Sequence, residues 1–399
     1  MTQDFAARVR RVEPSATIAI SNKASALEAD GVDIVDCSVG EPDFDTPDNV
    51  KRAGKDAMDA GHTGYTPSNG IPRLKEAIAA YLADDGLDHY GPENVIVTPG
   101  GKQALFEVFQ AVVDDGDEVA LLDPAWVSYE AMAKLSGGTL QRVDTAAHDF
   151  RLEPALDDLQ EVVSDDTELL VVNSPGNPHG AVYSEAALRG VADLANDHDV
   201  TVISDEIYKE ITYDVTAHSL GAVTDIDRDN LVTVNGFSKA YAMTGWRLGY
   251  LAAPEAVVSQ AGKLHSHSVS CAVNFVQHAG VEALENTDEA VAEMVDAFEE
   301  RRDMLLDLFA DHGKDVVRPD GAFYMMLPVG EDGAGSEDQR TGDGDPVDQS
   351  WCERAIDEAH VATVPGSAFG TPGYARLSYA NSKDRLREGV QRLADADLL

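Results

Sequence analysis

Short apolar segments alternate with amphipathic helical segments through the middle of this chain, and this alternation constrains the fold more than any other feature. Helices are expected between most of the strands, for example at 103–113 and 185–198. A strand, a helix and another strand in succession favour an α/β fold with a mostly parallel sheet covered on both faces. The expected strands are 94–98, 118–122, 169–173, 200–204, 231–235 and 247–253.

The pattern changes near residue 288, where a long charged helix at 288–309 is expected to open a smaller unit. Short apolar segments follow at 316–317, 323–327, 361–364 and 375–379, and a final helix starts at Lys383. This mixture predicts a small α+β domain at 288–399. We place a large domain at 46–287, and at 1–45 an N-terminal arm that also contributes to the small domain. Residues 330–345 are rich in Gly, Asp and Glu without an apolar period, which predicts a solvated loop.

Charge is the outlying property of the composition. The 399 residues include 72 acidic and 30 basic side chains, a net charge of −42, while 43% of residues are hydrophobic. Such a chain repels nucleic acid and anionic membranes, so neither is an expected partner. The acidic residues are dispersed along the chain, which favours a folded, halophilic protein whose self-repulsion is screened by salt. An acidic surface for a basic partner is the less favoured alternative, because a partner site would concentrate the charge.

Other general features point to a cytoplasmic protein. No apolar stretch approaches the roughly 18 to 20 residues of a membrane span, and residues 1–4 do not begin a secretory signal. The three cysteines, Cys37, Cys271 and Cys352, are far apart and lack metal-ligand spacing. Free thiols and no metal site are therefore expected.

Lys239 and Arg247 carry the strongest chemical signal. Lys239 follows the apolar strand 231–235, and Arg247 comes eight residues later. Polar groups at the carboxyl end of a parallel strand lie where α/β folds bind ligands. A buried lysine amine can form a Schiff base with an aldehyde, and an arginine can bind a phosphate. Together they suggest pyridoxal 5′-phosphate (PLP), although for the pair alone a structural lysine and a surface arginine are equally good explanations.

Other strand ends carry matching groups, each with an ordinary structural alternative. Gly100 and Gly101 open a helix where backbone N–H groups could bind an anion. Asn177 lies in a Pro-rich loop that would otherwise be read as a simple turn. Asp205 could pair with a pyridinium nitrogen or cap a helix, and Trp126 could cover a cofactor or fill the core. Because all of them fall at the same predicted edge of the sheet, a shared ligand site explains the set better than separate structural roles.

These segments resemble the class I aminotransferases, which are PLP-dependent enzymes of fold type I, and the resemblance covers nearly the whole chain. It is closest to the bacterial and archaeal aspartate aminotransferase subgroup that includes prephenate-accepting members. The segments that carry it are 40–47, Tyr65 with 70–74, 100–105, 126–129, the loop around Asn177, 204–208, the segment of Lys239, and 376–379.

The resemblance implies a role for each candidate residue. Lys239 bonds to the cofactor aldehyde and later moves the proton, while Asp205 holds the pyridine nitrogen protonated. Asn177 and Tyr208 hydrogen-bond the phenolic oxygen, and Trp126 stacks on the ring. Arg376 binds the substrate α-carboxylate, and Gly40 leaves room beside it. Gly100, Gly101, Lys102, Arg247 and Tyr65, the last from the neighbouring subunit of a homodimer, surround the phosphate or the substrate end. Lys102 and Thr17 are linked to the distal carboxylate of a dicarboxylic substrate.

Two positions depart from the family pattern. A hydroxyl residue often stands three before the lysine, and here that position is Gly236, so Ser238 or a backbone N–H is expected to replace the phosphate contact. His179 stands where the family usually has a threonine, and we expect a structural position near the surface rather than a catalytic role.

The expected function is ping-pong transfer of an amino group from an L-amino acid, most favourably aspartate, to 2-oxoglutarate. Aromatic, prephenate or neutral substrates, or β-elimination of a C–S bond by a lyase of the same fold, are the alternatives. A PLP-sensing regulator would need a DNA-binding module and a basic face, and the sequence shows neither.

Overall fold

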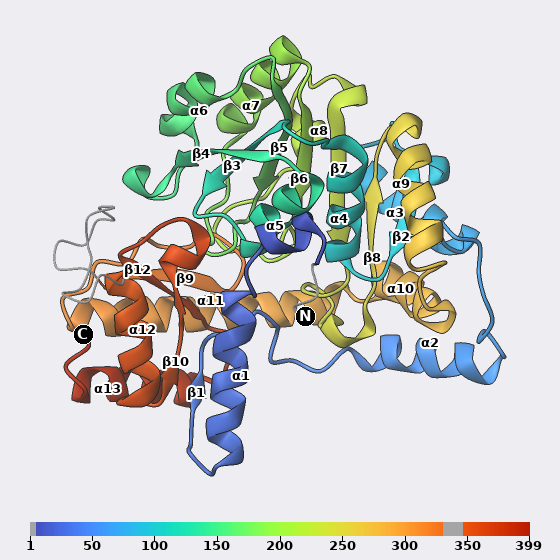
Figure 1. The fold of residues 1–399 in the computed structure, drawn as a ribbon. Coiled ribbons are helices and arrows are strands. Elements are labelled where there is room, and N and C mark those ends of the chain that lie inside the picture. The colour runs from blue at the N-terminus through green and yellow to red at the C-terminus, as the bar shows by residue number, and fades with distance from the viewer. Residues whose placement is uncertain (1–4, 330–345) are drawn as a thin grey trace.

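The computed structural model describes residues 5–329 and 346–399. Within these residues the strands form three sheets, of seven, three and two strands (Figure 1). The solvated loop predicted at 330–345 lies outside the described residues. None of the described helices combines the length and the apolar character that a membrane crossing requires.

The large sheet has the strand order β2-β8-β7-β6-β5-β3-β4. Strands β3 to β7 pair in parallel, whereas β8 runs antiparallel to both of its neighbours. The carboxyl ends of the parallel strands and the start of β8 therefore meet at one edge. The strands are β2 (Val95–Thr98), β3 (Glu118–Asp123), β4 (Thr139–Asp144), β5 (Thr167–Asn173), β6 (Thr201–Asp205), β7 (Leu231–Gly236) and β8 (Gly249–Ala252).

Helices cover both faces of this sheet, so alternate residues of a strand enter different cores. In β3, Val119 and Leu121 pack with α4, α5 and α9, whereas Ala120 and Leu122 pack with α6 and α7. Burial on both faces explains why the strands are nearly continuous apolar runs. The helices around the sheet are α2 (Asp48–Asp59), α3 (Pro72–Asp84), α4 (Gly101–Val112), α5 (Val127–Ser136), α6 (Leu156–Val162), α7 (Glu185–His198), α8 (Leu220–Val223), α9 (Glu255–Ser268) and α10 (Asn274–Asn286).

The C-terminal elements form a mixed α and β unit beside the large sheet (Figure 1). Its antiparallel sheet has the order β11-β12-β9, and β1 of the N-terminal arm pairs in parallel with β10. Helix α1 packs against these elements through Ala24 and Ile356. The elements are α1 (Ala16–Ala29), β1 (Val35–Asp36), α11 (Asp288–Asp311), β9 (Tyr324–Pro328), α12 (Val347–Asp357), β10 (Val361–Ala362), β11 (Val364–Pro365), β12 (Tyr374–Ser378) and α13 (Lys383–Asp395).

The six predicted strands correspond to β2, β3, β5, β6, β7 and β8, with small shifts at their ends. The predicted α/β class, with a mostly parallel sheet beside a mixed unit, is confirmed. Strand β4 was not predicted, and residues 316–317 form no strand. The domain boundaries after residues 45 and 287 remain predictions. Short 3₁₀ helices lie at Ala7–Arg11, Pro92–Asn94, Ala146–His148, Glu153–Ala155, Arg228–Asn230, Thr244–Trp246 and Gly366–Phe369.

Candidate active site

A cavity of about 390 Å³ opens at the edge where the parallel strands of the large sheet end. Its volume lies in the range of small-molecule sites. Twelve of the residues singled out in the sequence line it, from the N-terminal arm, the large sheet and β12. They are Thr17, Gly40, Gly101, Lys102, Trp126, Asn177, Asp205, Tyr208, Ser238, Lys239, Arg247 and Arg376.

Lys239 lies just past the end of β7, and its amine donates a hydrogen bond to the carbonyl oxygen of Gly40. The amine lies 5.6 Å from the centre of the Tyr208 ring. Burial lowers the pKa of this amine to about 8. The guanidinium of Arg376 adds to the lowering of the pKa, whereas Glu41 opposes it. An amine with this pKa is available as a nucleophile and as a proton carrier near neutral pH.

Asp205 ends β6 with a buried carboxylate that two donors hold in place. The hydroxyl of Tyr129 donates to Oδ2 at 2.6 Å, and the backbone N–H of Ile207 donates to Oδ1 at 3.2 Å. Burial nevertheless raises the pKa of Asp205 to about 6, against the effects of both donors and of Lys239. A buried carboxylate without a full counter-charge favours a cationic ligand atom next to it.

The neighbouring strand holds the loop of Asn177. The register of β5 and β6 places Asn173 beside Asp205, and the Asn173 amide donates to the Asp205 backbone oxygen at 2.9 Å. The Asn173 side-chain oxygen accepts from the backbone N–H of Asn177 at 2.9 Å. Asn177 is thereby fixed to the strand that adjoins Asp205.

Arg376 lies on β12 with only 2% of its surface exposed. Its Nη1 donates to Asn177 Oδ1 at 3.0 Å, and its Nη2 donates to the carbonyl oxygen of Ser38. The guanidinium lies 4.7 Å from the centre of the Tyr324 ring. Among the described residues its Nε has no hydrogen-bond partner. Arg376 is therefore a buried cation with one N–H donor that has no partner among the described residues. Such a group suits a carboxylate ligand.

The start of α4 forms a second cationic region with Arg247. Gly100 has a φ of +87°, and a Cβ at this position would lie 2.5 Å from Nη2 of Arg247. Glycine is therefore required both for the backbone conformation and for the approach of the arginine. The helix start, the guanidinium and the amine of Lys102 together provide the charge and the N–H groups that bind phosphate.

Gly236 is explained by a close approach of two strands. A Cβ at Gly236 would lie 2.9 Å from the Cα of Gly249 in the adjacent β8. This backbone has no room for a hydroxyl side chain at that position. Ser238 does line the cavity, so it is the hydroxyl residue that this segment presents there.

Two predicted residues lie elsewhere, and one expectation is wrong. Tyr65 is 90% exposed and lies outside the cavity, in a groove with residues 271–275. Gly100 adjoins the cavity without lining it.

His179 is not near the surface: it is 4% exposed, and its Nδ1 accepts from the backbone N–H of Ala181 at 3.0 Å. It stacks on Phe150, with ring centres 5.6 Å apart. Burial lowers the pKa of His179 to about 3, so the ring is neutral. It fills the core behind the Asn177 loop.

Sequence reasoning gave no role to Tyr129, Asn173 or Tyr324, although all three line the cavity. The hydroxyl of Tyr324 lies 2.8 Å from that of Tyr208. A Cβ added to Gly40 would lie 2.7 Å from the Tyr324 hydroxyl, so that glycine gives room to the tyrosine. Tyr129 and Asn173 lie within four residues of the predicted residues Trp126 and Asn177 at strand ends. This closeness to a strand end could have identified them from the sequence. Tyr324 begins a strand of the other unit and carried no such signal.

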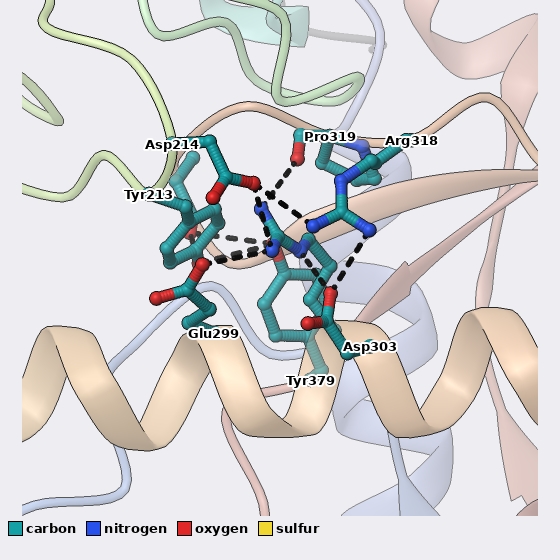
Figure 2. A network of polar contacts seen from close by, with 9 residues as sticks. Tyr213, Asp214, Glu299, Asp303, Arg318, Pro319 and Tyr379 are labelled. Atoms are coloured by element: carbon teal, nitrogen blue, oxygen red, sulfur yellow. Dashed lines mark hydrogen bonds and ion pairs between the residues drawn. The ribbon is translucent and has the colours of Figure 1, made fainter.

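A network of polar contacts joins α11 to the segments of Asp214 and Arg318 (Figure 2). Arg302 has no exposed surface, and its guanidinium lies 4.5 Å from the Tyr213 ring centre. The Tyr213 hydroxyl donates to the carbonyl oxygen of Ala322, two residues before Tyr324. The Arg302 guanidinium also contacts Asp214, Glu299, Asp303 and the carbonyl oxygen of Pro319.

Comparisons with known proteins agree with this geometry. The family profile described as aminotransferase class I and II matches residues 32–393. A probable aspartate/prephenate aminotransferase of Aquifex aeolicus is 42% identical, with 99% of each chain covered. The aspartate/prephenate aminotransferase of Thermus thermophilus is 41% identical, with 97% of each chain covered.

Solved structures give the same result. The aspartate aminotransferase of Thermus thermophilus with maleate is 40% identical with a TM-score of 0.91, covering 99% of this chain and 100% of that one. The aspartate aminotransferase of Rhizobium meliloti is 34% identical with a TM-score of 0.91 over 100% of both chains. The chain therefore belongs to the class I and II aminotransferases, PLP-dependent enzymes of fold type I that transfer amino groups between amino acids and oxo acids.

Proposed function

We propose that this aminotransferase uses aspartate and 2-oxoglutarate as its preferred pair, and that the residues around the cavity act as follows. PLP supplies an aldehyde that condenses with amines and a pyridinium ring that accepts electrons from the α-carbon of an amino acid. Three features fit this cofactor: the amine of Lys239, the buried carboxylate of Asp205, and the cationic start of α4. The absence of a side chain at Gly100 lets the Arg247 guanidinium approach the start of α4.

Lys239 moves the proton. Its lowered pKa leaves a substantial fraction of the amine neutral near pH 8, so Nζ can take the α-proton of the amino acid and release it again. Asp205 holds a proton on the ring nitrogen by placing a buried negative charge beside it. The hydroxyl of Tyr129 donates to that carboxylate and holds it in place at the cavity.

Arg376 orients the substrate by its α-carboxylate. The free Nε and the Nη2 edge of a planar guanidinium can bind two carboxylate oxygens at once, although Nη2 also donates to Ser38. Tyr208 and Tyr324, joined through their hydroxyls, form the wall beside it. Closely packed aromatic rings around the guanidinium exclude water from this part of the site.

Lys102 is the residue that we propose binds the distal carboxylate of a dicarboxylic substrate. Its amine lies over the Trp126 ring, 4.7 Å from the ring centre. Loss of hydration in the cavity, followed by the charge of Arg247, lowers its pKa. Among the described residues no carboxylate lies within ion-pair distance of Lys102, so its charge is available to a ligand. Thr17 of α1 lines the same cavity.

The experiment compares donors in wild type, Lys102→Met and Lys102→Arg with 2-oxoglutarate as acceptor. Loss of the charge should lower kcat/KM for aspartate about tenfold more than for a neutral or aromatic donor, since each tenfold corresponds to 1.4 kcal/mol. Lys102→Arg should keep most of the preference for aspartate. The PLP dissociation constant is measured in parallel. If Lys102→Met weakens PLP binding and all donors fall equally, Lys102 balances the phosphate and does not select the substrate.

Aspartate/prephenate relatives favour prephenate as a second oxo-acid acceptor, because two such proteins are above 40% identical over nearly the whole chain. The donor comparison also separates the remaining alternatives. A wild type that prefers alanine or an aromatic donor would contradict the aspartate assignment. Pyruvate and ammonia from a C–S substrate would identify a lyase.

The proposed assembly is a homodimer with shared active sites, in the cytoplasm. Tyr65 lies outside the cavity of its own chain and is 90% exposed, which suits a residue that reaches the neighbouring subunit. Ile18, Leu264 and Val273 are also exposed apolar side chains, and such groups are typical of interfaces. The three cysteines are free thiols, as a reducing compartment favours.

A further inference from the structure

The loop that carries Tyr65 is held by hydrogen bonds from partly and fully buried side chains, although Tyr65 itself is exposed. The Asn274 amide donates to the carbonyl oxygen of Gly64 at 3.0 Å. The Gln277 side chain, which is fully buried, accepts from the backbone N–H of Ile71 at 2.7 Å. Both residues belong to α10. The loop is therefore fixed at its two ends by one helix.

The middle of the loop is held by a different helix. His265 of α9 has no exposed surface, and its Nε2 lies 3.1 Å from the carbonyl oxygen of Ser68. Its Nδ1 lies 2.9 Å from Oε1 of Glu107, which belongs to α4 and is 1% exposed. One imidazole thus connects the Tyr65 loop to the helix whose first residues form the cationic region of the active site.

The hydrogen bonds fix both sides of the imidazole ring. A carbonyl oxygen only accepts, so Nε2 of His265 carries a hydrogen and donates to Ser68. Nδ1 is hydrogen-bonded to the Glu107 carboxyl group. Glu107 also accepts from the Gln103 amide at 2.8 Å and from the Ser268 hydroxyl at 3.5 Å. His265 and Glu107 therefore form a fully buried hydrogen-bonded pair.

A buried polar pair is weak support for a role in stability. Replacing both partners by apolar groups of the same shape can be nearly neutral or stabilising. What the imidazole provides, and an apolar residue does not, is a directed N–H donor and a second ring nitrogen at a fixed separation. Here the N–H donor binds the backbone of the loop that carries Tyr65.

We propose that His265 is a positioning residue that fixes the Tyr65 loop and acts on the active site of the neighbouring subunit. The inference rests on the proposed dimer with a shared site. The competing possibility is an effect within the same subunit, transmitted along α4 to Gly101 and Lys102. The two possibilities differ in which active site is damaged when His265 is changed.

Hybrid dimers with one inactivated site separate them. In the first hybrid, one chain carries Lys239→Ala and the other carries His265→Gln. In the second, one chain carries both substitutions and the other is wild type. Both hybrids contain the same two changes, so they are matched in composition. The working Lys239 faces a loop with an intact His265 in the first hybrid, and a loop without it in the second.

The proposal predicts that kcat/KM of the second hybrid is about tenfold below that of the first, since small misplacements of an active-site group cost this much or more. The first should match a hybrid of Lys239→Ala with wild type. The PLP dissociation constant at the working site should rise in the second hybrid only. Equal values in the two hybrids, or a loss in the first, would overturn the proposal.

Two further sets of hybrid dimers separate a failure of the proposed dimer from a failure of the role of His265. Hybrids with Tyr65→Phe in place of His265→Gln test the shared site itself. If the Tyr65 hybrids do not differ, the proposed dimer is wrong; if they differ and the His265 hybrids do not, only the role of His265 is wrong. Should His265→Gln chains fail to fold, Glu107→Gln/His265→Gln replaces both members of the buried pair and is used in the same pair of hybrids, with the same outcomes.

Discussion

Burial, more than any neighbouring charge, sets the pKa values of Lys239 and Asp205. Both shifts favour the neutral form, the amine toward about 8 and the carboxyl toward about 6. A neutral amine suits nucleophilic attack and proton transfer. Burial alone disfavours the ionised form of the carboxyl group, but a cationic ring nitrogen beside it would make that form favourable.

The pKa of Asp205 predicts a pH effect on the cofactor-free protein. The folded-state pKa of about 6 exceeds the ordinary value of 3.8, so the folded state binds the extra proton. The contribution of this group to stability therefore falls as pH rises from about 4 to 6. An asparagine does not titrate, so Asp205→Asn does not lose stability in this way. The free energy of unfolding of the variant, relative to that of wild type, should therefore increase by up to about 3 kcal/mol as pH rises across that range. Denaturant unfolding of both cofactor-free proteins at several pH values checks it. A difference that stays constant with pH would contradict the burial argument.

Residues at strand ends were predictable because a parallel sheet gathers them at one edge. Lys239, Asp205 and Asn177 all followed apolar strands in the sequence. Tyr324 and the burial of His179 were not predictable, since each depends on contacts between segments far apart in the chain. Sequence likewise indicated that Gly236 was unusual, but only the approach of Gly249 explains it.

Among the strands of the large sheet, the buried ones were predictable, including β2 at one edge, whereas the half-exposed edge strand β4 was not. Strand β4 (Thr139–Asp144) is half-exposed and contains Gln141 and Arg142, so it lacks the apolar run that marks the central strands. The rest of the large sheet is apolar on both faces, and sequence alone indicates such strands well. The parallel pairing of β1 with β10 joins segments over 300 residues apart, which no local pattern reports.

Arg302 of α11 and Arg318, which follows that helix, allow a buried arginine to be compared with an exposed one. Arg302 and Arg318 both contact Asp214 and Asp303, but their side chains are 0% and 50% exposed. Arg302→Met should lower the free energy of unfolding by about 2 kcal/mol, because it leaves the buried carbonyl oxygen of Pro319 without its donor and removes the guanidinium from the Tyr213 ring. Arg318→Ala should cost at most about 1 kcal/mol, as exposed pairs do. Denaturant unfolding of the two variants measures this. Equal losses would mean that the buried contacts of Arg302 in Figure 2 do not stabilise the fold.

At the scale of the whole molecule, net charge and assembly dominate. A net charge of −42 opposes compaction in dilute buffer and is screened in concentrated salt. The composition could predict this property, but it could not place Tyr65, which lies outside the cavity of its own chain and which we propose acts in a neighbouring subunit.

Salt should therefore stabilise this protein. Raising KCl from about 0.1 M to about 2 M shortens the screening length from about 10 Å to below about 3 Å. The midpoint of thermal unfolding should rise by many degrees over this range. The comparison is run with and without PLP, so that tighter cofactor binding is not mistaken for screening. An unchanged midpoint in both forms would assign the acidity to some other cause.

We expect this chain to remove the amino group of aspartate and to hold it on its cofactor until an oxo acid arrives. PLP-loaded protein is mixed with aspartate in the absence of any oxo acid, and the visible absorbance and the products are followed. We expect one equivalent of oxaloacetate per chain and loss of the visible band of lysine-bound PLP. The band should return on adding 2-oxoglutarate, with formation of glutamate. Lys239→Ala should show neither the band nor the release. Continued turnover without an oxo acid, or no oxaloacetate from the wild type, would contradict the claim.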